Sequence, residues 1–175
     1  DLDHEEGLIA LCTLSAINWG KFVSFARLDS ESSQPARQDA KLKEACEMAV
    51  RGLDALLDYQ EYPVEEARRH SMKYRPLGIG IIGFAHWLAK SRLMWGDKDT
   101  HVEVEEMMEK MAYYLTEASI DLAEEFGAIT TKTPYHDGIF PKDTAYVKAN
   151  TKMPWDMLKK RAIQHGIRNA TLMAL

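Results

Sequence analysis

The sequence predicts a single α/β domain that is predominantly helical, and three observations indicate this fold class. At 175 residues with 46% hydrophobic side chains, the chain is long enough to bury one core. Two long segments, at about 36–59 and 102–126, repeat apolar residues at the i, i+3, i+4 spacing of amphipathic helices. The segment 8–17 instead alternates with the period of a β-strand.

The first predicted strand covers residues 8–17. One row of its side chains is Leu8, Ala10, Cys12, Leu14 and Ala16, and the other is Ile9, Leu11, Thr13, Ser15 and Ile17. Both rows are largely apolar, so we expect a strand covered on both faces, as in a parallel sheet or barrel. The alanines on either side of Cys12 leave room beside its sulfur.

The first long helix is expected from about Ala36 to Tyr59, after a polar loop at 29–38. Its apolar stripe consists of Leu42, Ala45, Cys46, Ala49, Val50, Leu53, Leu56 and Leu57. Because Cys46 lies within this stripe, we interpret it as a small buried core residue. Pro63 disfavours helical backbone at the residue before it and so separates this helix from the next segment.

The rest of the chain predicts three more helical stretches and two strands. In order, these are a strand running into a helix at 75–93, a long helix at about 102–126 ended by Gly127, an irregular stretch at 132–154, a helix at about 155–165 and a strand at 167–175. A single domain seldom begins and ends with strands that are apolar on both faces, because such strands need neighbours. We therefore expect the chain to be a piece of a larger α/β protein.

Three glycines match the dinucleotide-binding pattern GxGxxG, namely Gly78, Gly80 and Gly83. That pattern requires an apolar strand before it and an acidic residue at the end of the next strand. Here the preceding residues are polar, and the nearest acids, Asp97 and Asp99, fall in an expected turn. Tight strand-to-helix packing is therefore the favoured use of these glycines.

Charge and composition exclude several classes of protein. The net charge of −5 argues against nucleic-acid binding, and the basic clusters at 67–75 and 158–162 are interpreted as solvated helix surfaces. The pair nearest to the metal-binding spacing Glu-x-x-His is Glu66 and His70, at i, i+4, which indicates a surface pair rather than a metal site. No apolar stretch is long enough to span a membrane, the first residues are acidic and no CxxC occurs, so we expect a cytoplasmic chain with reduced thiols.

Five segments in chain order together resemble the catalytic large subunit of class I ribonucleotide reductase. They are GLIALCTLSAINWG, RGLDALLDYQEYP, RPLGIGIIGFAHWLAK, YYLTEASIDLAEEFGA and GIRNATLMAL. The resemblance implies that residues 1–175 form one segment of the catalytic barrel domain. That segment would contribute a few strands and four to five helices to a ten-stranded α/β barrel.

The family reduces ribonucleoside diphosphates by thiyl-radical chemistry, an oxidoreductase step of deoxyribonucleotide biosynthesis that serves DNA replication. By resemblance, Cys12 matches one of two cysteines that donate electrons as the 2′ hydroxyl leaves and that become a disulfide. Leu14, two residues further on the same face, would lie near the substrate. The family needs a radical-generating metallo-subunit, a dithiol reductant and nucleotide effectors, and the resemblance assigns no cofactor or metal ligand to this chain.

Several family features are expected outside this chain. The radical cysteine of an Asn-x-Cys-x-Glu segment would precede residue 1, and a phosphate-binding Pro-Ser-Glu segment would follow Leu175. We therefore expect an internal fragment that is inactive alone. Its partners would be the remaining parts of the large subunit and the small radical-generating subunit.

Three alternatives stay open at this point. The chain could be one piece of a split reductase that docks through its unpaired strands. It could be a helical scaffold or interaction module that retains the fold without the chemistry. The unpaired strand edges could also pair with each other and form a homo-oligomer.

Overall fold

The computed structural model describes residues 2–3, 7–11, 13–29, 31–140, 143 and 151–174. The strands are β1 (Leu2–Asp3), β2 (Leu8–Ile9), β3 (Thr13–Asn18) and β4 (Leu77–Ile82), and the helices are α1 (Gln34–Tyr59), α2 (Glu65–Tyr74), α3 (Phe84–Ser91), α4 (Lys98–Phe126) and α5 (Trp155–His165). Short 3-10 turns lie at η1 (Trp19–Lys21), η2 (Phe25–Arg27) and η3 (Pro134–Asp137). Five α-helices among the described residues confirm the predominantly helical α/β prediction.

The N-terminal strand is shorter than predicted. The described part of 8–17 is divided between β2, which pairs antiparallel with β1, and β3, which starts at Thr13. β3 pairs parallel with β4, with Leu14 opposite Gly78. Cys12 lies outside the described residues.

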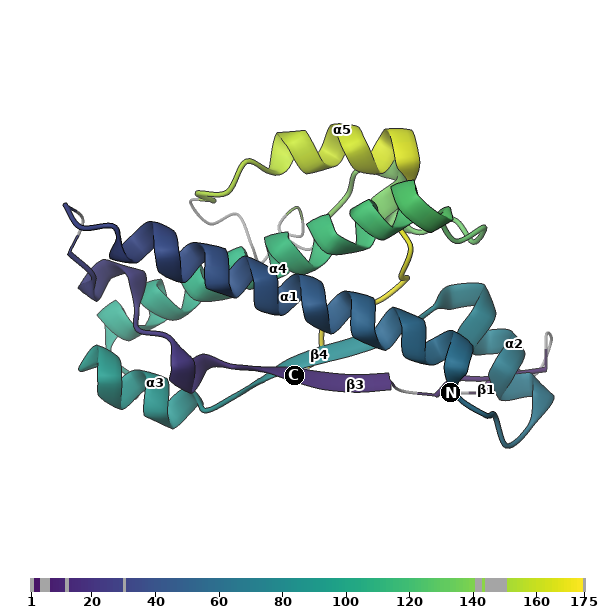
Figure 1. Cartoon of the computed structure of the whole chain (residues 1–175), viewed down its shortest axis with the longest axis horizontal. Helices are drawn as coiled ribbons and strands as arrows, with labels where there is room; N and C mark the ends of the chain where they lie inside the picture. The colour runs from purple at the N-terminus through teal and green to yellow at the C-terminus, as the bar shows by residue number, and fades with distance from the viewer. Residues whose placement is uncertain are drawn as a thin grey trace.

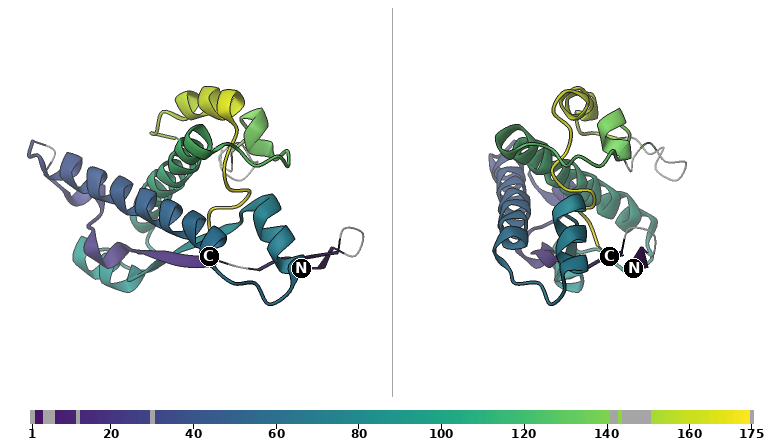
Figure 2. Two further views of the ribbon diagram at one scale, coloured as in Figure 1. Left: turned by 45° about the vertical axis from the view of Figure 1, so that its right-hand side comes forward. Right: turned by 90° about the vertical axis from the view of Figure 1, so that its right-hand side faces the viewer.

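The C-terminal segment adds a third parallel neighbour to this sheet. Ile79 forms a parallel bridge with Met173, and the amides of Leu77 and Ile79 donate to the carbonyls of Thr171 and Leu172 at 3.0 and 2.9 Å. The expected strand at 167–175 is therefore realised only as this short bridge. Figure 2 shows the segment after α5 running down to the sheet.

The helices lie on one side of the sheet. α1 packs against β3 and β4, α4 packs against α1, and α5 packs against α4 (Figure 1), while α2 and α3 lie at opposite ends of the strands. The order β3, β4, 171–174 follows the chain order, and each crossover carries helices. Parallel strands in chain order with helices on one face are typical of a barrel wall, whereas a doubly wound sheet has helices on both faces.

The hydrophobic core fills the space between the sheet and helices α1 and α4. Ile17, Leu77 and Ile79 of the strands belong to the same buried cluster as Leu42, Cys46 and Val50 of α1 and Met107, Met111 and Leu115 of α4. The apolar stripes predicted for the two long helices are therefore the faces that they bury. α4 begins four residues before the expected position. The apolar repeat did not indicate this first turn, because its residues are polar.

Cys46 is a core residue, as predicted. Its side chain is fully buried in α1, and burial raises the pKa of its thiol to about 12. The thiolate is the reactive form of cysteine, so this side chain stays protonated and shielded in the folded chain.

We expect this thiol to resist modification. In a Cys12→Ser chain, which keeps Cys46 as its only cysteine, an aromatic disulfide reagent at pH 8 should label the thiol only after denaturant is added. Absorbance of the released thiolate measures the reaction, with the same chain in denaturant as the control. Labelling of the native chain at the rate of a free thiol would contradict the buried position.

The basic cluster at 67–75 is solvated only in part. Arg68 and Arg69 of α2 are exposed, as expected, and they pair with Glu65 and Glu66 three residues earlier. Arg75, which follows α2, is instead buried, so the prediction of a solvated surface is wrong for this residue. The cluster at 158–162 lies on α5, where the two lysines are exposed.

Candidate functional site

One face of the sheet carries no helix. We call it the Leu14 face, and it consists of Leu14, Ala16, Gly78, Gly80 and Ala174. The side chain of Leu14 is 62% exposed, whereas Thr13 and Ile17 of the other row are buried. The expectation that β3 is covered on both faces is therefore wrong for the Leu14 row, because the described strands form one wall and no opposite wall.

Two glycines of β4, Gly78 and Gly80, allow side chain and backbone of the neighbouring strands to lie close to them on the Leu14 face. A Cβ at Gly78 would lie 2.6 Å from the Leu14 Cδ2 atom and 3.1 Å from the Ala174 Cβ atom. A Cβ at Gly80 would lie 3.0 Å from the backbone oxygen of Ala174. These two glycines therefore serve strand-to-strand contact, and not the strand-to-helix packing predicted for them.

The dinucleotide-binding pattern is not formed. Gly78 and Gly80 lie within β4 and not in a turn after it, so no helix N-terminus is presented by them. Only Gly83 lies at the start of a helix, α3, where its φ of 73° suits glycine and its Cα lies close to the side chain of Asn18. The favoured interpretation, packing, therefore holds for Gly83.

We expect a methyl group on the Leu14 face to cost stability. Gly80→Ala should lower the free energy of unfolding by about 1–3 kcal/mol, because its new Cβ would lie 3.0 Å from the backbone oxygen of Ala174, which would have to shift to make room. Gly52→Ala is the matched control: it lies within α1 with nothing within 4 Å of its Cβ position, so it should stabilise by about 0.5–1 kcal/mol. Urea unfolding measures both, and equal effects of the two substitutions would refute the close approach.

A buried polar network lies at the end of the sheet where β4 begins. Asp54 of α1 is 4% exposed, Arg75 is 5% exposed and Asn169 is fully buried. The Asp54 carboxylate accepts hydrogen bonds from Arg75 Nε at 2.7 Å and from Asn169 Nδ2 at 2.9 Å. Arg168 Nε lies 3.3 Å from the second oxygen of the same carboxylate.

The network extends to two more side chains. Arg75 donates to both carboxylate oxygens of Asp58, at 2.9 and 2.7 Å, and to the backbone oxygen of Asp54 at 2.8 Å. These bonds hold the pKa of Asp58 below its ordinary value. On the far side, the Ser119 hydroxyl donates to Asn169 Oδ1 at 2.7 Å and accepts from the backbone N–H of Asn169 at 3.1 Å.

The described residues bring together no group of three or more His, Cys, Asp or Glu side chains that could hold a metal ion. Glu66 pairs with Arg69, and the His70 ring lies 4.9 Å from that of Tyr74. Burial lowers the pKa of His70. Within the same residues, no helix is long and apolar enough to cross a membrane.

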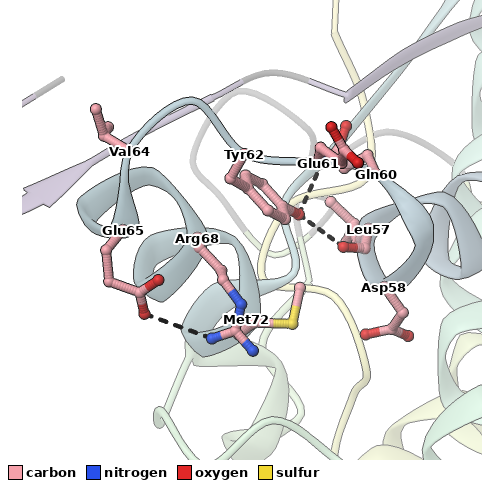
Figure 3. Close-up of a pocket in the computed structure, with 9 residues that line it drawn as sticks. All are labelled: Leu57, Asp58, Gln60, Glu61, Tyr62, Val64, Glu65, Arg68 and Met72. Carbon is pink, nitrogen blue, oxygen red and sulfur yellow. Dashed lines mark hydrogen bonds and ion pairs between the residues drawn. The ribbon is translucent and has the colours of Figure 1, made fainter.

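A groove of about 490 Å³ lies where α1 ends and α2 begins (Figure 3). The Tyr62 side chain lines this groove, and its hydroxyl donates to the Leu57 carbonyl at 2.7 Å and accepts from Gln60 at 2.8 Å. Arg68 and Glu65 line its other side and pair at 3.5 Å. Four of its polar side chains are thus engaged with groups that line it, and Asp58 at its edge is bonded to Arg75.

A family profile described as "Ribonucleotide reductase, barrel domain" matches residues 2–175. The chain belongs to this family. The ribonucleoside-diphosphate reductase subunit alpha of Haemophilus influenzae is 42% identical over 99% of the chain, and that of Buchnera aphidicola from Acyrthosiphon pisum is 40% identical over all of it. The ribonucleoside-diphosphate reductase large chain of Encephalitozoon cuniculi is 33% identical over 95% of the chain.

The chain covers only part of the length of these relatives. It spans 22% of the length of the Haemophilus and Buchnera relatives. The resemblance found in the five sequence segments is thereby confirmed at the level of the family. The roles predicted for Cys12 and Leu14 stay predictions, because Cys12 is not described and no ligand accompanies Leu14.

Sequence reasoning missed the buried network of the barrel segment. Its members lie in four of the five segments that carry the resemblance: Asp54 and Asp58 in RGLDALLDYQEYP, Arg75 at the first residue of RPLGIGIIGFAHWLAK, Ser119 in YYLTEASIDLAEEFGA, and Arg168 and Asn169 in GIRNATLMAL. Asp54 interrupts an apolar stretch of α1, and a buried carboxylate must be paired. An aspartate at this position was therefore a signal for a buried ion pair. Its partner, Arg75, is 21 residues further along the chain and cannot be deduced from sequence spacing.

Proposed function

We propose that the chain supplies one wall of the catalytic barrel in a ribonucleoside-diphosphate reductase large subunit. In this proposal residues 1–175 form a single segment of the ten-stranded barrel, and the Leu14 face is turned toward the barrel interior. The observation that carries the proposal is the uncovered, small-residue face of a parallel sheet that has α1, α4 and α5 on its other side and α2 and α3 at the ends of its strands. Such a face is the inner surface of a barrel wall.

Position 12 directly precedes β3, which carries Leu14. In the proposed reaction the Cys12 thiol and a second cysteine outside this chain form a disulfide. Each sulfur gives up one proton and one electron, and the ribose 2′ hydroxyl leaves as water while the carbon is reduced. Leu14 contacts the substrate beside the sulfur, and the closed barrel keeps solvent from the radical intermediate.

The chain alone is proposed to be inactive. Hydrogen abstraction from the ribose and binding of the substrate phosphates would be supplied by other parts of the large subunit. The small radical-generating subunit, a dithiol reductant and nucleotide effectors would complete the enzyme, and none of them is bound by residues proposed here.

The proposal is tested by exchanging segments. The matching segment of the Haemophilus influenzae relative is replaced by this chain, and deoxyribonucleotide formation is measured with the small subunit, a dithiol and a ribonucleoside diphosphate. Turnover within about tenfold of the parent supports the proposal, since segments of one family share their core geometry. A folded hybrid without turnover would favour a scaffold that retains the fold and not the chemistry.

We also propose that the isolated chain self-associates. Leu14 and Ile82, on neighbouring strands, are 62% and 54% exposed, and β3 pairs with no strand but β4 among the described residues. Exposed strand edges with apolar side chains pair readily. Light scattering of the purified chain should give a mass of at least twice 19.9 kDa, and Leu14→Lys should lower it. A clean monomer at micromolar concentration would count against this proposal.

A further inference from the structure

The buried network ties together the starting points of two neighbouring strands. Arg75 lies two residues before β4, and Asn169 lies two residues before the segment 171–174. Both donate to the same oxygen of Asp54, at 2.7 and 2.9 Å. Asn169 also donates to the backbone oxygen of Arg75 at 3.1 Å, so the two strands are linked directly where they enter the sheet.

The backbone bonds around the network fix the same alignment. The amide of Ala170 donates to the Tyr74 carbonyl at 2.9 Å, just before the Leu77 amide donates to Thr171 at 3.0 Å. On the other side, the Arg168 amide donates to the Ser119 carbonyl at 3.2 Å. The segment 168–170 is thus held between α4 and the end of α2 before it joins β4.

Arg75 has an unusual backbone for its residue type. It adopts the left-handed conformation, with φ 44° and ψ 53°, which costs a residue with a side chain about 1–2 kcal/mol. Its guanidinium makes four hydrogen bonds to Asp54 and Asp58, at 2.7 to 2.9 Å. A glycine at this position would relieve the backbone strain but would remove the shorter of the two ion pairs of Asp54, leaving only the one with Arg168 at 3.3 Å.

We propose that Asp54, Arg75 and Asn169 are positioning residues that set the register of segment 171–174 along β4 and so shape the Leu14 face. A shift of one residue would reverse the faces of that segment and remove Ala174 from its place beside Gly78. The catalytic consequence rests on the function proposed above. The register itself does not depend on that function.

The test compares two conservative replacements. Arg75→Lys keeps the charge but offers one nitrogen in place of the three that bind Asp54 and Asp58. Arg161→Lys is the matched control, because Arg161 also bridges two carboxylates, Asp121 and Glu124, but does so on α5, away from the strands. Asn169→Asp, which exchanges an amide nitrogen for an oxygen, serves if Arg75→Lys does not fold.

The first readout is hydrogen exchange at the amides of Leu77 and Ile79 in this chain. We expect exchange more than about tenfold faster in Arg75→Lys than in Arg161→Lys, because these amides are bonded to the segment whose register is loosened. Unchanged exchange at both amides in a folded Arg75→Lys or Asn169→Asp chain overturns the proposal.

The second readout is turnover per folded molecule in the hybrid reductase, well below its melting temperature. A purely structural role would leave this value unchanged, whereas a positioning role lowers it by about tenfold or more. Faster exchange with unchanged turnover overturns the positioning role. If the hybrid with the unaltered chain shows no turnover, the proposed function fails, and the exchange measurement alone decides the register.

Discussion

In the proposed reaction, replacing Cys12 with serine should abolish deoxyribonucleotide formation in the hybrid large subunit. The serine hydroxyl cannot form a disulfide, so the two electrons needed at the ribose carbon have no donor within the barrel. We expect turnover to fall by about a thousandfold or more, the scale on which loss of one member of a catalytic unit acts. Product formation over many turnovers is the measurement.

The neighbouring residue supplies the control for this replacement. Thr13→Ser changes a buried side chain in the row opposite Leu14 and leaves a hydroxyl in place. It should retain most of the activity, while its stability falls slightly through the lost methyl group. Full activity of the Cys12→Ser hybrid would show that this sulfur takes no part in the reduction.

Replacing Asp54 with alanine should lower the free energy of unfolding of the chain strongly. It removes the buried counter-ion of Arg75, which then keeps only the half-exposed Asp58, and it removes one of the two acceptors of Asn169 Nδ2. Removing one partner of a buried pair costs about 3–5 kcal/mol, because the other charge stays out of water. Domains are stable by about 5–15 kcal/mol, so this loss is a large share of the total.

The matched control for Asp54→Ala is a carboxylate of the same helix on its solvent side. Glu47→Ala removes an exposed i,i+4 partner of Arg51 and should cost no more than about 0.5 kcal/mol. Urea unfolding followed by circular dichroism compares the two. A cost below about 1 kcal/mol for Asp54→Ala would mean that Arg75 reaches water when its partner is removed.

The network also predicts the direction of the acid response. Arg75 lowers the pKa of Asp58 in the folded chain, so the stability that Asp58 contributes is present above its unfolded pKa, near 3.8, and is lost as the pH falls below it. The stability of Asp54→Ala should therefore be compared with that of the parent chain at pH 7, where Asp58 is ionised and contributes fully in both chains.

Helices were the most predictable part of the fold. The stripe through Leu42, Cys46 and Val50 follows the helical period, and these residues form the core where α1 meets the sheet. The bounds of α5, Trp155–His165, are also predictable, because Pro154 and Gly166 stand at its two ends. Local rules sufficed for these elements.

The strands and the network were less predictable, since they depend on distant partners. The alternation of 8–17 gives no sign of the division between β2 and β3, nor that the row of Leu14 is uncovered. Arg75 belongs to a basic cluster that looks solvated, and only the folded chain brings it to Asp54. Of the candidate site, the sequence pointed to Leu14 and Cys12 through family resemblance, and the three network residues were missed.

The most direct test follows the sulfur at position 12 through one turnover. The hybrid reductase is reduced, freed of dithiol, given one equivalent of a ribonucleoside diphosphate together with the small subunit, quenched with an alkylating reagent and digested for mass spectrometry. We predict that the peptide containing Cys12 is recovered in a disulfide with a cysteine outside residues 1–175, in proportion to the product formed. Product formed while Cys12 is recovered only in its alkylated, reduced form would contradict the proposed role of this sulfur.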